Sequence, residues 1–306
     1  MSENESMKGQ DQTKYVAAVV IAGTLWGFMG LFRRNLADLG ISAGGIVFIR
    51  CGLAAVLLLA TLLVRDRAAL KIKLRDLWCF LGSGLCSMLF FTYCYYQAMN
   101  YMSLSVAAIL LYTAPIIVVV LSAALFREKF TGRKRTALLL AFLGCCLVSG
   151  LGSDTRLSWI GIFYGLGSGF GYALYSIFAR LALERGYSSL TVTFYTCLFA
   201  AIGAGVIWGV YEPVTLMFAS KQGIFWSLGI AFFTCYLAYL LYTYSLTGLE
   251  TGRASIFANI EPVVATVVGM AVFHEPMTLL NLLGILSVLA AVVLLSVKDR
   301  KEESQA

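Results

Sequence analysis

Residues 260–275 read IEPVVATVVGMAVFHE, and residues 113–128 read TAPIIVVVLSAALFRE. Aligned at a fixed offset of 147 residues, the two stretches match a proline and a glutamate: Pro115 with Pro262, and Glu128 with Glu275. In both stretches an apolar run separates the proline from the glutamate. A match at a fixed offset within one chain indicates an internal duplication.

The duplication extends beyond these two stretches. The same offset pairs Tyr95 with Tyr242 and Thr131 with Thr278, and an offset of 144 pairs Gly23 and Gly27 with Gly167 and Gly171. We therefore divide the chain into four parts: an N-terminal tail (1–14), a first repeat (15–152), a second repeat (159–297) and a C-terminal tail (298–306).

The composition places both repeats in a membrane. Of the 306 residues 60% are apolar and only 13% are charged, whereas soluble domains have about 25% charged residues. A helix needs roughly 20 apolar residues to cross the hydrocarbon layer, and lipid does not tolerate open strand edges. We predict an all-α integral membrane protein with ten transmembrane helices, at residues 15–33, 44–64, 77–99, 103–126, 136–152, 159–183, 190–211, 222–246, 252–273 and 277–297.

The number of helices in each repeat determines how the repeats are oriented. Because five is odd, the second repeat enters the membrane upside down, which predicts two inverted five-helix repeats. With both termini in the cytoplasm, eighteen lysine and arginine residues lie on the cytoplasmic side, and four lie outside: Arg33, Arg34, Arg156 and Lys221. Basic residues favour the cytoplasmic side. We therefore predict a multi-pass protein of the cell (cytoplasmic) membrane with both termini in the cytoplasm.

The net charge of +7 and the eight cysteines do not require a ligand. The basic residues lie in short loops, which is typical of topology signals and does not favour a nucleic-acid partner. The cysteines lie within apolar runs without a CxxC pair, and His274 is the single histidine. We predict no metal site and no cofactor. The polar first fourteen residues lead directly into a full-length span, so no removable signal peptide is expected.

Four features of the sequence resemble those of a known protein family. They are the repeated proline–glutamate spacing, the five-plus-five layout, the Trp26-Gly27 pair, and the phrase Ile260-Glu261-Pro262-Val263 before Phe273-His274-Glu275. Over residues 15–297 the chain resembles the EamA-type transporters of the drug/metabolite transporter superfamily. The resemblance implies transport without specifying the substrate, because similar proteins export amino acids or drugs or take up metabolites, and distant relatives exchange nucleotide sugars. The Arg33-Arg34 pair departs from the family pattern, in which a less charged sequence is expected.

Ionisable residues within the predicted spans are candidates for function, because placing such a side chain in the membrane costs free energy and is therefore rare without a role. Glu261 lies about halfway along residues 252–273, and its repeat partner is Ala114. It could exchange a coupling proton, hold a cationic amine, or satisfy the backbone beside Pro262. Arg50 could bind a substrate carboxylate, pair with Glu261, or extend to the membrane surface.

Aromatic and amide side chains provide the other candidates. Tyrosines within a span need hydrogen-bond partners that lipid does not supply, so the two interpretations are a central polar cavity and ordinary helix packing. The predicted substrate-binding residues are Trp26, Arg50, Tyr93, Tyr96, Gln97, Tyr112, Tyr175, Tyr239, Tyr242 and Asn259. Pro115 and Pro262 are predicted to break their helices and to take part in gating.

The sequence therefore favours a secondary active transporter that exports a small amino-acid-like or amphipathic metabolite by alternating access. No nucleotide-hydrolysing motif is present in the sequence, so ATP is not expected to drive transport directly. Glu261 is the predicted site of proton coupling. The alternatives are a uniporter, an exchanger or an importer of another metabolite class. A membrane enzyme or a scaffold is a remote alternative, and we predict no enzymatic activity. The predicted partners are a small-molecule substrate, protons and membrane lipid, with the chain as a monomer or a homodimer.

Overall fold

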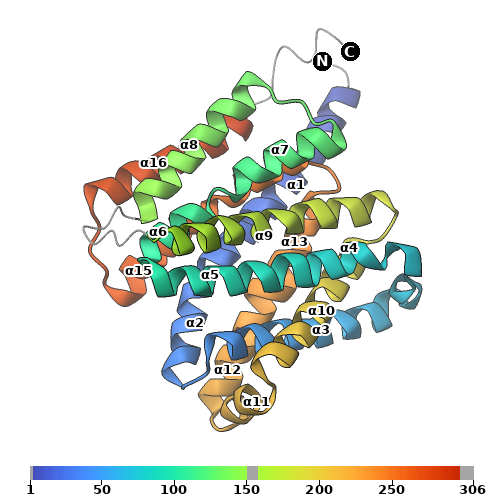
Figure 1. The fold of residues 1–306 in the computed structure, drawn as a ribbon. Helices are drawn as coiled ribbons and strands as arrows, with labels where there is room; N and C mark the ends of the chain where they lie inside the picture. The colour runs from blue at the N-terminus through green and yellow to red at the C-terminus, as the bar shows by residue number, and fades with distance from the viewer. Residues whose placement is uncertain (1–2, 150–157, 297–306) are drawn as a thin grey trace.

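The computed structural model describes residues 3–149 and 158–296, and within these ranges the chain forms helices and no β-strand (Figure 1). The helices of the first repeat are α1 (Glu3–Gly27), α2 (Met29–Asp38), α3 (Ala43–Arg65), η1 (Arg67–Leu70), η2 (Leu74–Asp76), α4 (Leu77–Leu81), η3 (Gly82–Leu89), α5 (Phe90–Tyr101), α6 (Leu104–Leu111), α7 (Ala114–Phe126) and α8 (Gly132–Ser149). Those of the second repeat are α9 (Trp159–Glu184), α10 (Ser189–Trp208), α11 (Tyr211–Phe218), α12 (Lys221–Gly229), η4 (Ile230–Leu237), α13 (Ala238–Ser245), α14 (Thr251–Ala258), α15 (Ile260–Phe273) and α16 (Leu279–Ser296).

Eight helical segments of the described chain are long and apolar enough to cross a membrane. They are residues 12–38, 43–65, 74–101, 104–126, 189–208, 221–245, 251–273 and 279–296. The two further predicted spans, 136–152 and 159–183, correspond to α8 and α9. These two helices are less apolar, because α8 begins with three basic residues and α9 is rich in glycine and tyrosine. The all-α membrane fold is thus confirmed, and the count of ten stays a prediction.

The ends of the chain add two details. The helix α1 already begins at Glu3, so the described part of the predicted tail at residues 1–14 is helical. The predicted tail at residues 298–306 lies outside the described residues, as do the last residues of the predicted span 136–152.

Local irregularities recur in the two repeats at matching positions. A π-helical stretch, η3, interrupts the third predicted span, and a second one, η4, interrupts the eighth. The helices α7 and α15 both end in a left-handed residue, Arg127 (φ 55°) and His274 (φ 53°). Since left-handed backbone is uncommon for residues other than glycine, its recurrence at equivalent positions supports the duplication seen in the sequence.

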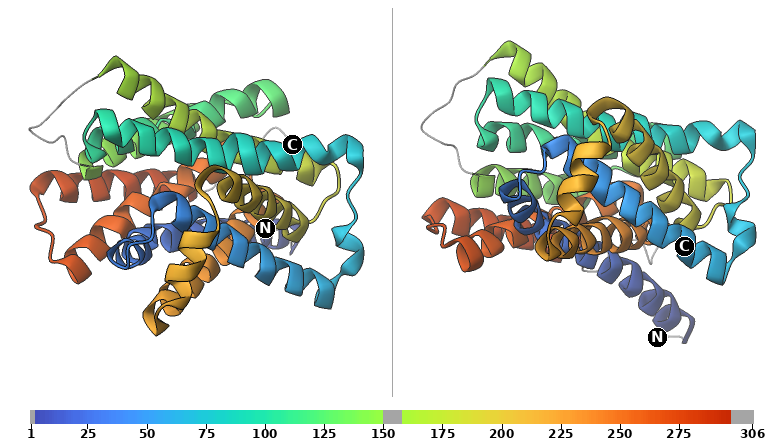
Figure 2. Two further views of the ribbon diagram at one scale, coloured as in Figure 1. Left: turned by 60° about the horizontal axis from the view of Figure 1, so that its bottom comes forward. Right: turned by 90° about the horizontal axis from the view of Figure 1, so that it is seen from below.

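The helices pack side by side in pairs that join the two repeats (Figures 1 and 2). One pair, α8 with α16, forms one edge of the molecule, and α3 with α10 lies near the opposite edge. The helix α1 lies between them and contacts α13, α14 and α15 of the second repeat. A helix of the first repeat therefore forms part of the packing around the breaks in the second.

Close packing of α1 requires glycine at residue 27. A Cβ atom built at Gly27 would lie 2.5 Å from the Cβ of Val264 and 2.9 Å from the carbonyl oxygen of Glu261. At Gly30, one turn further along the chain, a Cβ atom would meet nothing within 4 Å.

We expect Gly27→Ala to lower the thermal unfolding midpoint in detergent by several degrees, because overpacking against a backbone carbonyl costs about 1–3 kcal/mol. Gly30→Ala is the matched control, and its midpoint should stay within about one degree of the parent, since open space accepts the methyl group. Equal midpoints for the two variants would show that α1 does not approach α15 as closely as described.

Candidate substrate-binding cavity

A cavity of about 200 Å³ lies between the two repeats. Helices from both repeats line it: α1 and α2 with Trp26 and Met29, α3 with Arg50, α5 with Tyr95 and Tyr96, α9 with Tyr172, α13 with Tyr239, and α15 with Glu261. A narrower pocket adjoins it and shares Trp26, Tyr112, Tyr172, Tyr239 and Glu261. The combination of a mostly apolar wall with a few polar groups is typical of small-molecule sites.

Breaks in two helices place polar groups at this cavity. The fourth predicted span divides into α6 and α7 around Tyr112 and Thr113, and Pro115 lies in the first turn of α7. The ninth span divides at Asn259, and Glu261 and Pro262 occupy the first turn of α15. Discontinuous helices expose backbone groups and helix termini near the middle of the membrane, where transporters bind substrates.

Glu261 is a half-buried carboxylate at the start of a half-helix. Its one hydrogen bond within the described chain comes from the Tyr172 hydroxyl at 3.2 Å. The N-terminal end of a helix carries a partial positive charge that favours a carboxylate. Since no cationic side chain forms an ion pair with it in the described residues, Glu261 has lone pairs available for a proton or a ligand ammonium group.

Arg50 is the second charged group of the cavity, and its side chain is only 4% exposed. One terminal nitrogen lies 3.4 Å from the Met29 sulfur, and the Nε atom has no hydrogen-bond partner in the structure. Among residues 3–149 and 158–296, Arg50 forms no ion pair. A buried cation without a counter-ion is costly, and a planar guanidinium is suited to binding a carboxylate through two parallel hydrogen bonds.

Aromatic rings surround the space near these two charges. The Trp26 ring lies 5.1 Å from that of Tyr239 and 5.3 Å from that of Tyr242, and its Nε1 atom donates to the Thr234 carbonyl at 3.1 Å. The Tyr175 hydroxyl is 2.6 Å from the Thr243 hydroxyl. These bonds fix the rings, so the aromatic wall is preorganised for a ligand.

The structure brings most of the predicted binding residues together. Trp26, Arg50, Tyr96, Tyr112, Tyr175, Tyr239, Tyr242, Asn259, Glu261 and Pro115 line one or both of the adjoining pockets. Pro262 is buried in the first turn of α15 and does not line them.

Tyr93 and Gln97 are not brought to the cavity. The Tyr93 ring is 39% exposed and contacts Tyr164, and Gln97 accepts a hydrogen bond from Asn100 at 3.3 Å. The face of α5 that lines the cavity contains Thr92, Tyr95 and Tyr96 instead.

Sequence reasoning also left out residues that line the cavity. Tyr172 donates a hydrogen bond to Glu261; its spacing of three from Tyr175 marks the two as an aromatic pair on one helix, but only Tyr175 was among the predicted binding residues. Arg33 also lines the cavity, and the sequence marked it as a departure from the family pattern. Tyr95 is the repeat partner of Tyr242, which is itself in the adjoining pocket.

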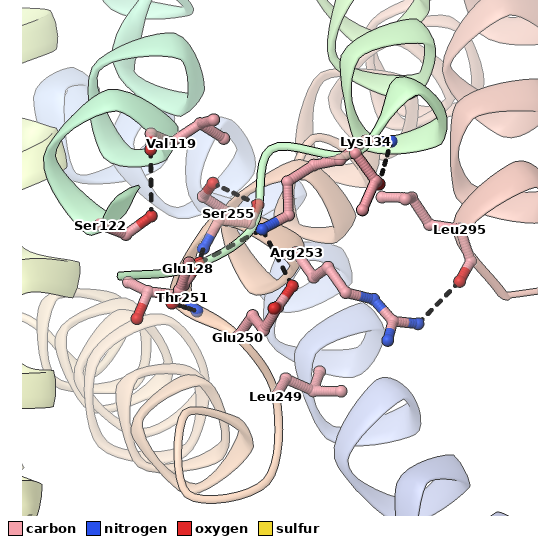
Figure 3. A network of polar contacts seen from close by, with 12 residues as sticks. Val119, Ser122, Glu128, Lys134, Leu249, Glu250, Thr251, Arg253, Ser255 and Leu295 are labelled. Carbon is pink, nitrogen blue, oxygen red and sulfur yellow. Dashed lines mark hydrogen bonds and ion pairs between the residues drawn. The ribbon is translucent and has the colours of Figure 1, made fainter. Parts of the chain in front are cut away.

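A buried polar network joins the two repeats at one end of the molecule (Figure 3). The Glu128 carboxylate, in the loop after α7, accepts hydrogen bonds from the backbone N–H groups of Thr251 and Gly252 at the start of α14. Lys134 lies 3.4 Å from Glu128 and 2.9 Å from Glu250. Burial alone would raise the pKa of Glu128, but the two N–H groups and the Lys134 ammonium outweigh it and hold that pKa below its usual value.

The opposite end of the molecule differs. Glu275, the repeat partner of Glu128, forms an ion pair with Arg34 at 2.6 Å, and both side chains are about half exposed. The first turn of α6 is capped by Ser103, whose hydroxyl accepts from the Val106 N–H at 3.5 Å. Glu128 thus joins the two repeats through a buried carboxylate, whereas the carboxylate of its repeat partner Glu275 is half exposed.

A family model supports this architecture. The model of the EamA-like transporter family matches residues 13–150 and again residues 159–297. The chain belongs to this family. This EamA-like transporter is 30% identical over 280 residues to an uncharacterized transporter of Archaeoglobus fulgidus, covering 91% of this chain and 94% of that protein. The resemblance noted from the sequence is therefore confirmed, and the chain is a multi-pass membrane transporter.

Two further comparisons extend the assignment. The EamA-like chain is 27% identical over 270 residues to the threonine/homoserine exporter RhtA of Escherichia coli, covering 86% of this chain and 84% of that protein. A solved crystal structure superimposes with a TM-score of 0.77 over 92% of this chain and 96% of that chain, at 13% identity. The second likeness concerns the fold alone.

Proposed function

We propose that the chain is a secondary active transporter that exports an amino-acid-like metabolite across the cytoplasmic membrane by alternating access. The observation that carries this proposal is the presence of two opposite charges in one cavity, Arg50 and Glu261, neither of which forms an ion pair in the described chain. An α-amino acid has a carboxylate for the first and an ammonium group for the second. The aromatic wall would contact its side chain or stack on the ammonium group.

Two further observations bear on this proposal, the first on the direction of transport and the second on the orientation in the membrane. The relative RhtA is named as an exporter of the amino acids threonine and homoserine. The Glu128 end of the molecule carries the basic loops, including residues 65–75 and 127–135, and basic loops favour the cytoplasm. On that orientation the network of Glu128 closes the cytoplasmic end.

Glu261 is the proposed coupling residue. It lies within the cavity at a helix break, and one carboxylate cannot hold a proton and a substrate ammonium group at the same time. Competition between the two would exchange a proton moving inward for an amino acid moving outward. Alternating access requires only that both repeats rearrange around this fixed site.

We expect purified protein in liposomes that contain a pH-sensitive dye to move protons when an amino acid is supplied. Threonine and homoserine are the first substrates to test, because the relative RhtA is named for them. Glu261→Gln should abolish substrate-dependent proton movement, because the amide of glutamine does not bind and release a proton as a carboxylate does. The same variant should still exchange labelled substrate across the membrane without net charge movement, at a reduced rate.

The control for this experiment is Glu184→Gln, which removes a surface carboxylate paired with Arg180 at the end of α9. Proton movement should be unchanged in that variant. Substrate exchange without proton movement in the parent protein would indicate a uniporter or an exchanger and would remove the coupling role of Glu261. If no amino acid is bound or exchanged, the proposed function itself is wrong.

A further inference from the structure

Arg33 places a second guanidinium group in the cavity. It lies on α2 and lines the same cavity as Arg50. Its guanidinium carbon is 5.6 Å from the centre of the Tyr96 ring, a cation–π contact with a residue that also lines the cavity. Within the described parts of the chain, Arg33 forms no ion pair.

The neighbouring Arg34, in contrast, is bound by other side chains of the protein. Its guanidinium pairs with Glu275 at 2.6 Å, stacks over the Phe273 ring at 4.1 Å, and is not among the residues that line the cavity. The two adjacent arginines therefore differ in whether a carboxylate of the protein neutralises them. Arg34 is neutralised by the protein, whereas Arg33 has its positive charge available at the cavity.

The charges that line the cavity do not balance. Arg33 and Arg50 contribute two positive charges and Glu261 contributes one negative charge. A neutral zwitterion would satisfy Arg50 and Glu261 and would leave Arg33 without an anion. Low-dielectric surroundings strengthen attraction between unscreened charges, so a ligand with a second anionic group would gain an interaction that a zwitterion lacks.

We propose, building on the proposed function, that the preferred cargo is an amino acid with a carboxylate side chain. Arg50 binds the α-carboxylate, Glu261 binds the ammonium group, and Arg33 binds the side-chain carboxylate beside Tyr96. Arg33 is thus a specificity-determining residue that distinguishes acidic from neutral amino acids.

The test compares L-glutamate with L-glutamine, which have nearly the same shape and differ by one negative charge. Exchange of each labelled amino acid is measured with purified protein in liposomes. The parent protein should favour glutamate by about tenfold or more, the size expected of one charge-assisted hydrogen bond. Arg33→Gln should lose this preference while it continues to exchange glutamine, and Arg33→Lys should keep part of it.

Arg34→Gln is the matched control, because it removes the same charge from the adjacent residue outside the cavity. It should keep the preference for glutamate. If Arg34→Gln loses the preference for glutamate as much as Arg33→Gln does, the preference depends on the net positive charge of this region and not on a specific contact with Arg33. That result would overturn the proposal. Exchange of glutamine or threonine equal to or better than that of glutamate in the parent would overturn the role of Arg33 and leave the proposed amino-acid transport intact. Exchange of none of these amino acids would refute both.

Discussion

Replacing Arg50 with methionine should raise the thermal stability of the protein and nearly abolish substrate binding. The stability gain follows from burial: Arg50 is 4% exposed, its Nε atom has no hydrogen-bond partner, and it forms no ion pair in the described chain. Methionine retains a long apolar side chain and removes the uncompensated charge, which costs several kcal/mol when buried. We expect a rise of a few degrees in the unfolding midpoint.

The loss of binding follows from the same guanidinium. If Arg50 holds the substrate carboxylate, its removal leaves that carboxylate desolvated and unpaired, which costs about 2–5 kcal/mol. Affinity should therefore fall by about 30-fold or more. Both quantities can be measured on one preparation, as the unfolding midpoint and its shift on adding amino acid.

Arg180→Met is the control for this experiment. The Arg180 guanidinium donates to the Leu246 and Leu249 carbonyl groups and pairs with Glu184 at 2.9 Å. Its replacement should lower the midpoint and leave the affinity unchanged, the reverse of Arg50→Met on both counts. A midpoint that falls in Arg50→Met would mean that Arg50 has a structural partner, and the binding role would lose its main support.

Much of the fold could be predicted from the sequence because membrane helices depend on length and apolar content. Eight predicted spans reappear as helical segments that can cross a membrane, and the offset of 147 residues identified the pairs of helices that share local irregularities. The predicted break beside Pro262 also follows from local chemistry, since proline removes a backbone donor.

The cavity was harder to predict, because periodicity gives the residues that share a helix face and not the direction of that face. Tyr93, Tyr96 and Gln97 have the i, i+3 and i+4 spacing of one helix face and were all predicted to bind substrate, but only Tyr96 lines the cavity. The π-helical η3 precedes α5 directly. A π-helix has more residues per turn than an α-helix, so the faces that follow it are rotated relative to a regular helix, and sequence spacing does not reveal this rotation.

The bonding partners of the two repeated glutamates could not be predicted from the repeat either. Glu128 and Glu275 hold equivalent positions after equivalent left-handed residues, yet one binds backbone N–H groups and the other binds Arg34. Inverted repeats must adopt different conformations if one end is closed while the other is open. Part of the asymmetry also lies in the sequence, because the offset of 147 residues places Asn281 opposite Lys134 and Ser103 opposite Glu250.

Glu128→Gln should loosen the end of the molecule at which the two repeats are joined. The carboxylate accepts from the N–H groups of Thr251 and Gly252, which have no other acceptor at the start of α14. An amide oxygen is a weaker acceptor without charge, and Lys134 would keep Glu250 as its remaining partner. Each charge-assisted hydrogen bond contributes about 1.5–3 kcal/mol, so amide hydrogen exchange at residues 251–255 should accelerate by about tenfold or more.

The repeat partner provides the control for this last experiment. Glu275→Gln removes an equivalent carboxylate that is half exposed and joined to Arg34, so hydrogen exchange at residues 104–106, at the start of α6, should stay unchanged. Because the pKa of Glu128 is held below its usual value, its contribution is complete at neutral pH and is lost as the pH falls through that lowered value. Intrinsic-rate-corrected exchange at residues 251–255 should therefore be constant from neutral pH down to the ordinary carboxyl range and should rise only in stronger acid. Equal acceleration at both ends by the two variants would show that the ends are equivalent, and the closed end would then not depend on Glu128.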